Sequence, residues 1–308
     1  MSDSGASDSK PAKPKEPVLD RMAAAVQHVA RPLTGATWRA PRRLKTLLSG
    51  SFLGHPLHPM LKDGVVGAWL LTTILDILWL INGGLFAWAA HAAQLTAMVG
   101  ILSAFAAIAT GTADWSDTYG PERHTGFIHG LLNASATLLY LISLGLRYDI
   151  FAGHLDVSQH AAANPAAAFV GFGGFVLMGI AAFLGGDLVF QLATGVNHEH
   201  FESAVRKWTG VGPMADVPEG KPYRVVAGKA PVVLLRNGEQ IYAIGATCTH
   251  NGGPLDKGAL DGLVIECPWH QSRFDLRNGH VITGPATVRA IRYDVRVTDG
   301  TVEVIAKK

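Results

Sequence analysis

Four apolar stretches, each about as long as a membrane-crossing helix, constrain this chain more than any other feature. They cover residues 64–82, 91–112, 126–146 and 165–192. A helix needs roughly 20 mostly apolar residues to cross the hydrocarbon core of a bilayer. From residue 63 to residue 192 the only Lys or Arg are Arg123 and Arg147, although the whole chain has 26. The pattern predicts an all-α transmembrane unit of four helices over 51–195.

Basic residues flank the four stretches on one side, and they predict how the chain is oriented. Before the first stretch and after the fourth stand Arg39, Arg42, Arg43, Lys45, Lys62, Arg206 and Lys207. The connections 83–90 and 147–164 hold only Arg147. Because Lys and Arg collect in cytoplasmic loops, both ends of the chain are expected in the cytoplasm.

The residues ahead of the first stretch divide into two parts. Residues 1–20 are polar and rich in Pro, Lys and Ser, which predicts a disordered tail rather than a signal peptide. Residues 21–50 mix apolar and basic residues, as helices that lie on the inner leaflet do. We therefore expect interfacial amphipathic helices over 21–50.

The chain changes character after Lys207. Short apolar runs such as APVVLLR and QIYAIGA alternate with Asn-Gly, Asp-Gly and Gly-Pro turn signals. This pattern is typical of antiparallel strands joined by tight turns, and it predicts a linker over 196–214 and an all-β domain over 215–308. No stripe of Lys and Arg with interleaved aromatic residues occurs, so no nucleic-acid partner is expected.

The only two cysteines of the chain fall in this β region, and each is followed closely by a histidine. Cys248 and His250 read C-x-H, sixteen residues follow, and Cys267 and His270 read C-x-x-H. Zinc fingers usually pair like ligands locally, two cysteines and then two histidines. Here each loop supplies one of each, which favours a [2Fe–2S] cluster with one iron on thiolates and one on imidazoles. Zinc, or a structural role, is the alternative.

This ligand pattern inside a β domain resembles the Rieske iron–sulfur domain, over roughly 215–308. The resemblance implies that Cys248 and Cys267 bind the inner iron of the cluster. It also implies that His250 and His270 bind the outer iron near the surface, where electrons enter or leave. Because oxidised iron lowers the pKa of its imidazole ligands, we expect a midpoint potential that falls with pH in the alkaline range.

Of four neighbouring residues, three set the site apart from the Rieske proteins of cytochrome bc complexes. Those proteins have two further cysteines joined in a disulfide, and Gly253 and Trp269 stand at those places. Ser272 matches a serine whose hydroxyl donates to a cluster sulfur, whereas Phe274 replaces a tyrosine that also donates. Hydrogen bonds to the sulfurs raise the potential. One donor kept and one lost predict a potential in the lower half of the roughly −150 to +300 mV Rieske range.

The membrane unit carries a signature of its own. The sequence GHPLHP at residues 54–59, with TGTADWSDTYGPERHTGFIHGLLN at 110–133, resembles a bacterial four-helix membrane family of unknown function. The resemblance supports four spans, and together with the flanking positive residues it predicts a multi-pass protein of the bacterial cytoplasmic (inner) membrane. It implies no particular activity.

Ionisable residues gather at the cytoplasmic ends of the predicted spans. They are His55, His58, Asp114, His124, His129 and Asp187. Such groups are costly at membrane depth and usually pair with each other or mark a site. Three interpretations stay open: a hydrogen-bonded network that joins helix ends, a pocket for a quinone headgroup, and a haem or metal site with His58 and His129 as the first pair to test. Asp76, in the middle of the first stretch, is expected to have a partner across the bundle.

Together these features favour a membrane-anchored Rieske protein that passes single electrons between a soluble partner and a membrane partner or quinone. The alternatives are an oxidoreductase subunit that uses the membrane His and Asp group, a plain anchor in a larger complex, and an oxygenase component. An oxygenase would need a mononuclear iron on two histidines and a carboxylate, and the sequence has no soluble segment to house one. We assign no catalytic residue and expect an electron carrier rather than a stand-alone enzyme.

Overall fold

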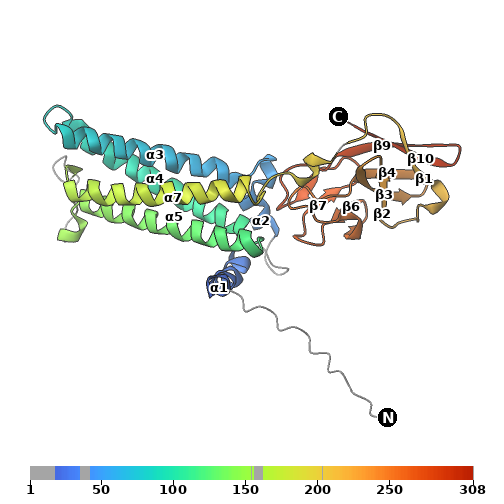
Figure 1. Cartoon of the computed structure of the whole chain (residues 1–308), viewed down its shortest axis with the longest axis horizontal. Coiled ribbons are helices and arrows are strands. Elements are labelled where there is room, and N and C mark those ends of the chain that lie inside the picture. The colour runs from blue at the N-terminus through green and yellow to red at the C-terminus, as the bar shows by residue number, and fades with distance from the viewer. Residues whose placement is uncertain (1–17, 35–41, 154, 156–161, 203, 308) are drawn as a thin grey trace, which may run out of the picture.

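The computed structural model describes residues 18–34, 42–153, 155, 162–202 and 204–307. A helical bundle and a β domain follow each other along the longest axis of the molecule (Figure 1). The chain therefore has the predicted architecture, an all-α unit followed by an all-β domain. Most of the tail predicted over 1–20 lies outside the described residues.

Four long helices form the bundle. They are α3 (Leu57–Ile81), α4 (Ala87–Trp115), α5 (Gly120–Arg147) and α7 (Pro165–Phe190). Proline stands in the first turn of α5 and of α7, where its missing N–H is not needed. All four helices are long and apolar enough to cross a membrane. Large apolar side chains such as Leu102, Phe105 and Phe183 are exposed on the bundle, as on a surface that lipid covers.

The bundle is built from two similar helical hairpins. α3 packs mainly on α4, and α5 packs mainly on α7. Residues 71 positions apart on α3 and α5 face each other across the bundle. The rings of Trp69 and Tyr140 stack with centroids 4.0 Å apart, and Asp76 forms an ion pair with Arg147 at 2.6 Å. Equivalent residues of the two hairpins therefore meet.

Glycines on the second helix of each hairpin repeat as well. Gly100 on α4 lies against Trp69, and Gly174 on α7 lies against Tyr140. A Cβ at Gly100 would lie 2.2 Å from Nε1 of Trp69, and a Cβ at Gly174 would lie 2.9 Å from Cδ2 of Tyr140. Only glycine at both positions lets the two large rings reach each other.

Asp76 has the partner across the bundle that the sequence predicts. Nη2 of Arg147 lies 2.8 Å from Oδ1 and 2.6 Å from Oδ2 of Asp76, and the two side chains are 1% and 3% exposed. Oγ of Ser143 is 3.4 Å from Nε of the same arginine. A buried pair of this kind is costly to break by removing one partner, because the other charge is then left uncompensated.

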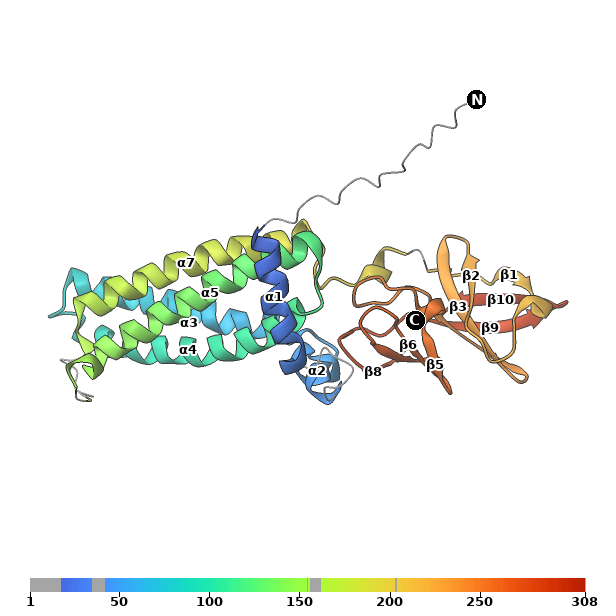
Figure 2. The same ribbon diagram turned by 90° about the horizontal axis from the view of Figure 1, so that it is seen from below.

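Two shorter helices lie at the end of the bundle that faces the β domain. They are α1 (Val18–Leu33) and α2 (Arg42–Ser49), and α1 runs across the long helices (Figure 2). Helices are predicted over 21–50, but α1 begins at Val18, inside the segment assigned to the tail. An ion pair between Asp20 and Arg123 of α5, at 2.9 Å, holds this first turn in place.

The β domain packs two antiparallel sheets against each other. One has the order β1-β10-β9-β4-β3-β2, with β1 (Thr209–Pro213), β10 (Thr301–Ala306), β9 (Arg292–Thr298), β4 (Gln240–Gly245), β3 (Ala230–Asn237) and β2 (Tyr223–Ala227). The other has the order β5-β6-β7-β8, with β5 (Ala259–Asp261), β6 (Val264–Glu266), β7 (Arg273–Asp275) and β8 (Val281–Thr283). The predicted Asn-Gly and Asp-Gly turns close hairpins at Gly238 and Gly300, whose φ angles are 65° and 74°.

The β domain begins earlier than the sequence predicts. β1 pairs with β10 although it lies inside the linker predicted over 196–214. Its Gly-rich sequence TGVGP and a register shift between Gly210 and Gly212 hide the strand from an alternation pattern. Glu199, also in the predicted linker, is 1% exposed and accepts hydrogen bonds from the backbone N–H of Ile291 at 3.0 and 2.9 Å. The linker is therefore packed onto the domain.

Stability is expected to depend on pH through Glu199. Burial raises the pKa of this carboxyl from its usual 4.5 to about 8. The folded state then holds a proton that the unfolded state has lost, so stability falls as pH rises between these two values. Glu199→Gln should remove this slope and gain roughly 3 to 5 kcal/mol over the wild type at pH 9, with little difference at pH 4. Denaturant unfolding over this pH range measures it. The exposed Glu239→Gln is the control, and an unchanged slope in Glu199→Gln would contradict the prediction.

Candidate metal centre

Two loops at one end of the β domain carry the four predicted ligands. Cys248 and His250 lie in the loop after β4, and Cys267 and His270 lie in the loop between β6 and β7. The first loop is closed by the N–H of Cys248 on the Gly253 carbonyl at 2.8 Å. The second is closed by the N–H of Cys267 on the Ser272 carbonyl, also at 2.8 Å. Each loop is therefore a tight turn that holds one cysteine and one histidine.

The structure brings the four side chains together. Both cysteines are free thiols, 2% and 1% exposed. The rings of His250 and His270 stand edge to face with centroids 5.0 Å apart. Nδ1 of His250 and Nε2 of His270 are buried without a hydrogen-bond partner among the described residues. Two thiols and two imidazoles with open nitrogens form a donor set that fits a [2Fe–2S] cluster.

Burial sets the protonation of these ligands. It lowers the pKa of His250 to about 3 and also lowers the pKa of His270, so both rings are neutral at pH 7. A hydrogen bond between the two thiols, followed by burial, raises the pKa of Cys248, and the same hydrogen bond lowers the pKa of Cys267 to about 7. Neutral imidazoles and a readily ionised thiol are the forms that bind metal.

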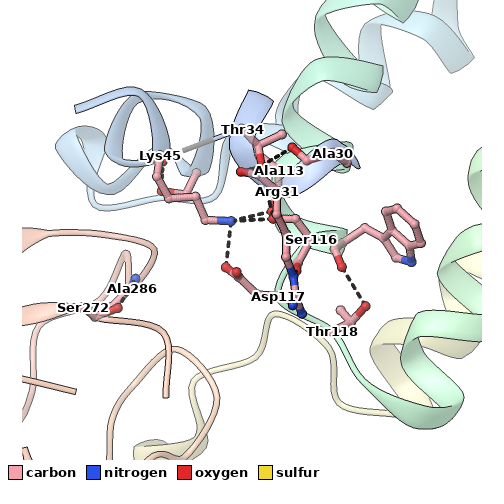
Figure 3. Close-up of polar contacts among 12 residues, drawn as sticks. Ala30, Arg31, Thr34, Lys45, Ala113, Ser116, Asp117, Thr118, Ser272 and Ala286 are labelled. Carbon is pink, nitrogen blue, oxygen red and sulfur yellow. Dashed lines mark hydrogen bonds and ion pairs between the residues drawn. The ribbon is translucent and has the colours of Figure 1, made fainter. Parts of the chain in front are cut away.

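The four residues predicted to surround the ligands differ in their contacts. A Cβ at Gly253 would lie 2.6 Å from Sγ of Cys267, so only glycine lets the first loop approach this sulfur. Phe274 is fully buried in the core of the domain. Trp269 is 54% exposed, with its ring centroid 6.5 Å from that of His270. The hydroxyl oxygen of buried Ser272 accepts from the N–H of Ala286 at 2.9 Å, so its own proton remains for another acceptor (Figure 3).

Removing this hydroxyl is expected to lower the midpoint potential. Ser272→Ala deletes a donor that favours the more negative reduced cluster, and a hydrogen bond to a charged group is worth about 1.5–3 kcal/mol. The expected shift is a fall of roughly 60 to 130 mV, measured by EPR-monitored redox titration. Thr301→Val, at an exposed end of β10, is the control. An unchanged potential in Ser272→Ala would show that the hydroxyl donates elsewhere.

The turn between α4 and α5 is held next to the two loops by α1 and α2. Nζ of Lys45, buried on α2, lies 2.7 Å from Oδ2 of Asp117 and 3.2 Å from Oγ of Ser116, and it donates to the Ala113 carbonyl (Figure 3). Backbone carbonyls of the same turn accept from α1, namely Trp115 and Thr118 from Gln27 and Ser116 from Arg31. The turn is therefore fixed by two helices.

This turn contacts the histidine side of the candidate centre. The ring of Tyr119 stacks on that of His270 with centroids 5.9 Å apart, and Arg31 lies 5.6 Å from the same tyrosine ring. A second contact joins the N–H of Gly284 to Oγ1 of Thr46 on α2 at 3.2 Å. The imidazoles thus face the membrane unit. Nothing in the local sequence marks Asp117 or Tyr119 as neighbours of the ligands, because the contact depends on how two distant units pack.

The six ionisable residues predicted to gather in the bundle do not all meet. His58 and His129 do, with ring centroids 6.4 Å apart. His55 is exposed with its ring against the Pro56 carbonyl, and Asp187 accepts from Gln191 on its own helix at 2.6 Å. Asp114 and His124 are half-buried on either side of the turn between α4 and α5. In the described part of the chain the structure therefore assembles one pair out of the predicted group.

Comparisons with known proteins match both units. The Rieske [2Fe-2S] domain family matches residues 207–299, and the family described as a predicted membrane protein (DUF2231) matches residues 54–198. The anthranilate 1,2-dioxygenase ferredoxin subunit of Burkholderia cepacia is 32% identical over 103 residues, which are 33% of this chain and 95% of that protein. Ferredoxin CarAc of Metapseudomonas resinovorans is 39% identical over 102 residues, again 33% and 95%.

A solved structure gives the same match. The ferredoxin of carbazole 1,9a-dioxygenase from Nocardioides aromaticivorans IC177 is 31% identical, with a TM-score of 0.31, over 33% of this chain and 99% of that one. The two ferredoxin relatives match 33% of this chain and 95% of their own length.

Proposed function

Because the chain belongs to the Rieske [2Fe–2S] family through its C-terminal domain, we propose that it is a membrane-held carrier of single electrons. Cys248 and Cys267 hold the inner iron in this proposal, and His250 and His270 hold the outer iron. The cluster supplies a reversible one-electron couple when bound. Gly253 would let the two loops approach each other around it, and Phe274 would support it from the core that contains both cysteines. Ser272 and Trp269 would adjust its surroundings.

One observation carries the proposed route of the electron. The ring of His270 lies against that of Tyr119 of the membrane unit. Burial lowers the pKa of His270, the negative charge of Asp117 raises it, and the positive charges of Lys45 and Arg31 lower it. Electrons pass through exposed imidazoles in the family that the sequence resembles, and here those imidazoles face the bundle. The membrane-side partner is therefore a group in or beside the bundle, a quinone or a bound redox centre. The other partner is a soluble redox protein, as the ferredoxin subunits of dioxygenases serve an enzyme.

The proposed setting is a bacterial cytoplasmic membrane that the chain crosses four times. Four helices of sufficient length and the basic residues at one end support this orientation, with both termini and the β domain in the cytoplasm. An oxidoreductase subunit that uses the histidines of the bundle is the second candidate, favoured by the pairing of His58 with His129. No observation favours an oxygenase component.

The donor preference of the full chain in lipid nanodiscs tests the route. We expect a lipid-soluble quinol to reduce the cluster faster than a soluble ferredoxin reductase does at equal concentration. The bleaching of the visible absorption of the cluster, recorded by stopped flow, measures both rates. Tyr119→Ala should slow reduction by quinol and leave the EPR signal of the cluster intact, because Tyr119 contacts a ligand without binding iron. Tyr148→Ala, at the far end of α5, is the matched control. A cluster that the soluble reductase reduces and quinol does not would contradict the route.

A further inference from the structure

His58 and His129 occupy equivalent places in the two hairpins and are held in the same way. Nδ1 of His58 lies 2.9 Å from the Ala107 carbonyl of α4, and Nδ1 of His129 lies 2.8 Å from the Ala181 carbonyl of α7. A carbonyl oxygen only accepts, so both Nδ1 atoms carry a proton. A cationic ring is costly inside an apolar bundle, and each Nε2 therefore keeps its lone pair. Histidines that bind metals are held by this kind of hydrogen bond.

The amide of Asn133 supports this tautomer at His129. Its Nδ2 lies 3.2 Å from Nε2 of His129 and 2.9 Å from the His129 carbonyl oxygen. An amide N–H donates, so Nε2 is the acceptor. Because the amide also has the carbonyl as a partner, Nε2 can exchange this bond for a metal ion without leaving the amide unsatisfied.

The distance between the ring centroids equals that of two imidazoles whose Nε2 atoms bind one metal ion from opposite sides. Their centroids are 6.4 Å apart and their planes cross at 84°. An imidazole nitrogen lies roughly 1.2 Å from the ring centre and a metal–nitrogen bond is about 2.0 Å long, so two imidazoles on opposite sides of one ion have centres about 6.4 Å apart.

Each imidazole also has a glycine beside it from the second helix of its own hairpin. A Cβ at Gly111 would lie 2.7 Å from Cε1 of His58, and a Cβ at Gly185 would lie 3.1 Å from Cε1 of His129. Gly111 follows Ala107 by one helical turn, and Gly185 follows Ala181 by one turn. The arrangement of histidine, carbonyl and glycine thus occurs once in each hairpin. A single group bound between the two hairpins would be held by both copies.

We propose that His58 and His129 are the two axial ligands of a haem iron held between the hairpins. Two imidazoles supply only two of the ligands that an iron ion takes. The remaining ligands of the ion then come from the bound group, as the ring nitrogens of a porphyrin do. Ala107 lies eight residues before the end of α4 at Trp115, or about 12 Å, so the site is close to the turn that contacts His270.

This inference deepens the proposed function, because the haem is the redox centre on the membrane side. Its role rests on that proposal, whereas haem binding itself does not. The two failures can therefore be told apart by recording the cluster and the haem on the same samples. A cluster without haem overturns this inference alone, and haem without a cluster contradicts the Rieske proposal alone.

Haem binding by the purified full chain tests the proposal. We expect the protein from cells supplied with a haem precursor, or titrated with haemin in detergent, to take up one haem per chain with the absorption and EPR spectra of six-coordinate low-spin iron. His58→Ala and His129→Ala should each lose the low-spin spectrum and weaken haemin binding by about tenfold or more. Added imidazole should restore the low-spin spectrum in the two variants, which separates loss of a ligand from loss of fold.

Two other histidines at the same end of the bundle serve as matched controls. His55→Ala and His124→Ala should bind haem as the wild type does. Wild-type protein that takes up no haem, or haem that both ligand substitutions leave unchanged, would overturn the proposal. Quinone found in the purified protein in place of haem would overturn it in favour of a quinone site.

Discussion

Cys267→Ala is expected to yield a chain that inserts into membranes but carries no iron–sulfur cluster. Cys267 is 1% exposed and stands in a loop that is closed by its own backbone hydrogen bond to Ser272. Without its thiolate the inner iron has a single protein ligand, and the remaining thiol and imidazoles are left buried without the group they bind. Iron and sulfide should fall to background, and the β domain should lose several kcal/mol of stability, because metal binding is coupled to folding.

Metal analysis and EPR of the purified protein check this expectation, and His270→Ala should give the same result. His280→Ala is the matched control, since His280 is exposed on the same domain. Retention of the cluster in Cys267→Ala or in His270→Ala would remove that residue from the ligand set. Zinc found at one ion per chain in the wild type, with no iron, would favour the alternative metal.

Asp76→Leu is expected to destabilise the bundle by about 3–5 kcal/mol. The substitution leaves the Arg147 guanidinium, 1% exposed, without its counter-charge inside the bundle. The double variant Asp76→Leu/Arg147→Met should recover most of this loss, because replacing both charges by apolar groups of similar size removes the cost of burying them. Unfolding of the full chain in mixed micelles, followed by circular dichroism, measures the free energies.

The exposed ion pair of Lys62 with Asp63 provides the comparison. Its side chains are 52% and 72% exposed, so Asp63→Leu should cost no more than about 1 kcal/mol. Equal effects of Asp76→Leu and Asp63→Leu would contradict the burial argument. A double variant no more stable than Asp76→Leu would show that the pair contributes through specific geometry rather than through its charge balance.

Features with a local signal were predictable from the sequence. The length and low charge of the four stretches identify the long helices, and Asn-Gly and Asp-Gly dipeptides mark the hairpins at Gly238 and Gly300. The spacing of Cys248, His250, Cys267 and His270 identifies the cluster motif, because its ligands come from two short loops. Each of these signals is contained within one segment of chain.

Features that depend on packing between segments were not predictable in this way. In the sequence Lys45 is one of the positive charges that predict the orientation, yet the structure buries it against Asp117. Arg147 falls in a predicted connection between spans, yet it forms the ion pair that neutralises Asp76. The strand β1 is hidden by glycines. The repeat of the two hairpins has a signal, because the spacing of 71 residues between Trp69 and Tyr140 also separates His58 from His129. The unlike residue types at Trp69 and Tyr140 conceal it at that place.

The most direct test of the account is an EPR-monitored redox titration of membranes from cells that produce the full chain. We predict a Rieske signal in the membrane fraction that titrates as a single one-electron couple, with a midpoint that falls as pH rises in the alkaline range. In oriented membrane layers this signal should vary with the angle to the field, because the contacts of Tyr119 and Thr46 fix the β domain on the bundle. Membranes that contain the chain and show no such signal under reducing conditions would contradict the central claim.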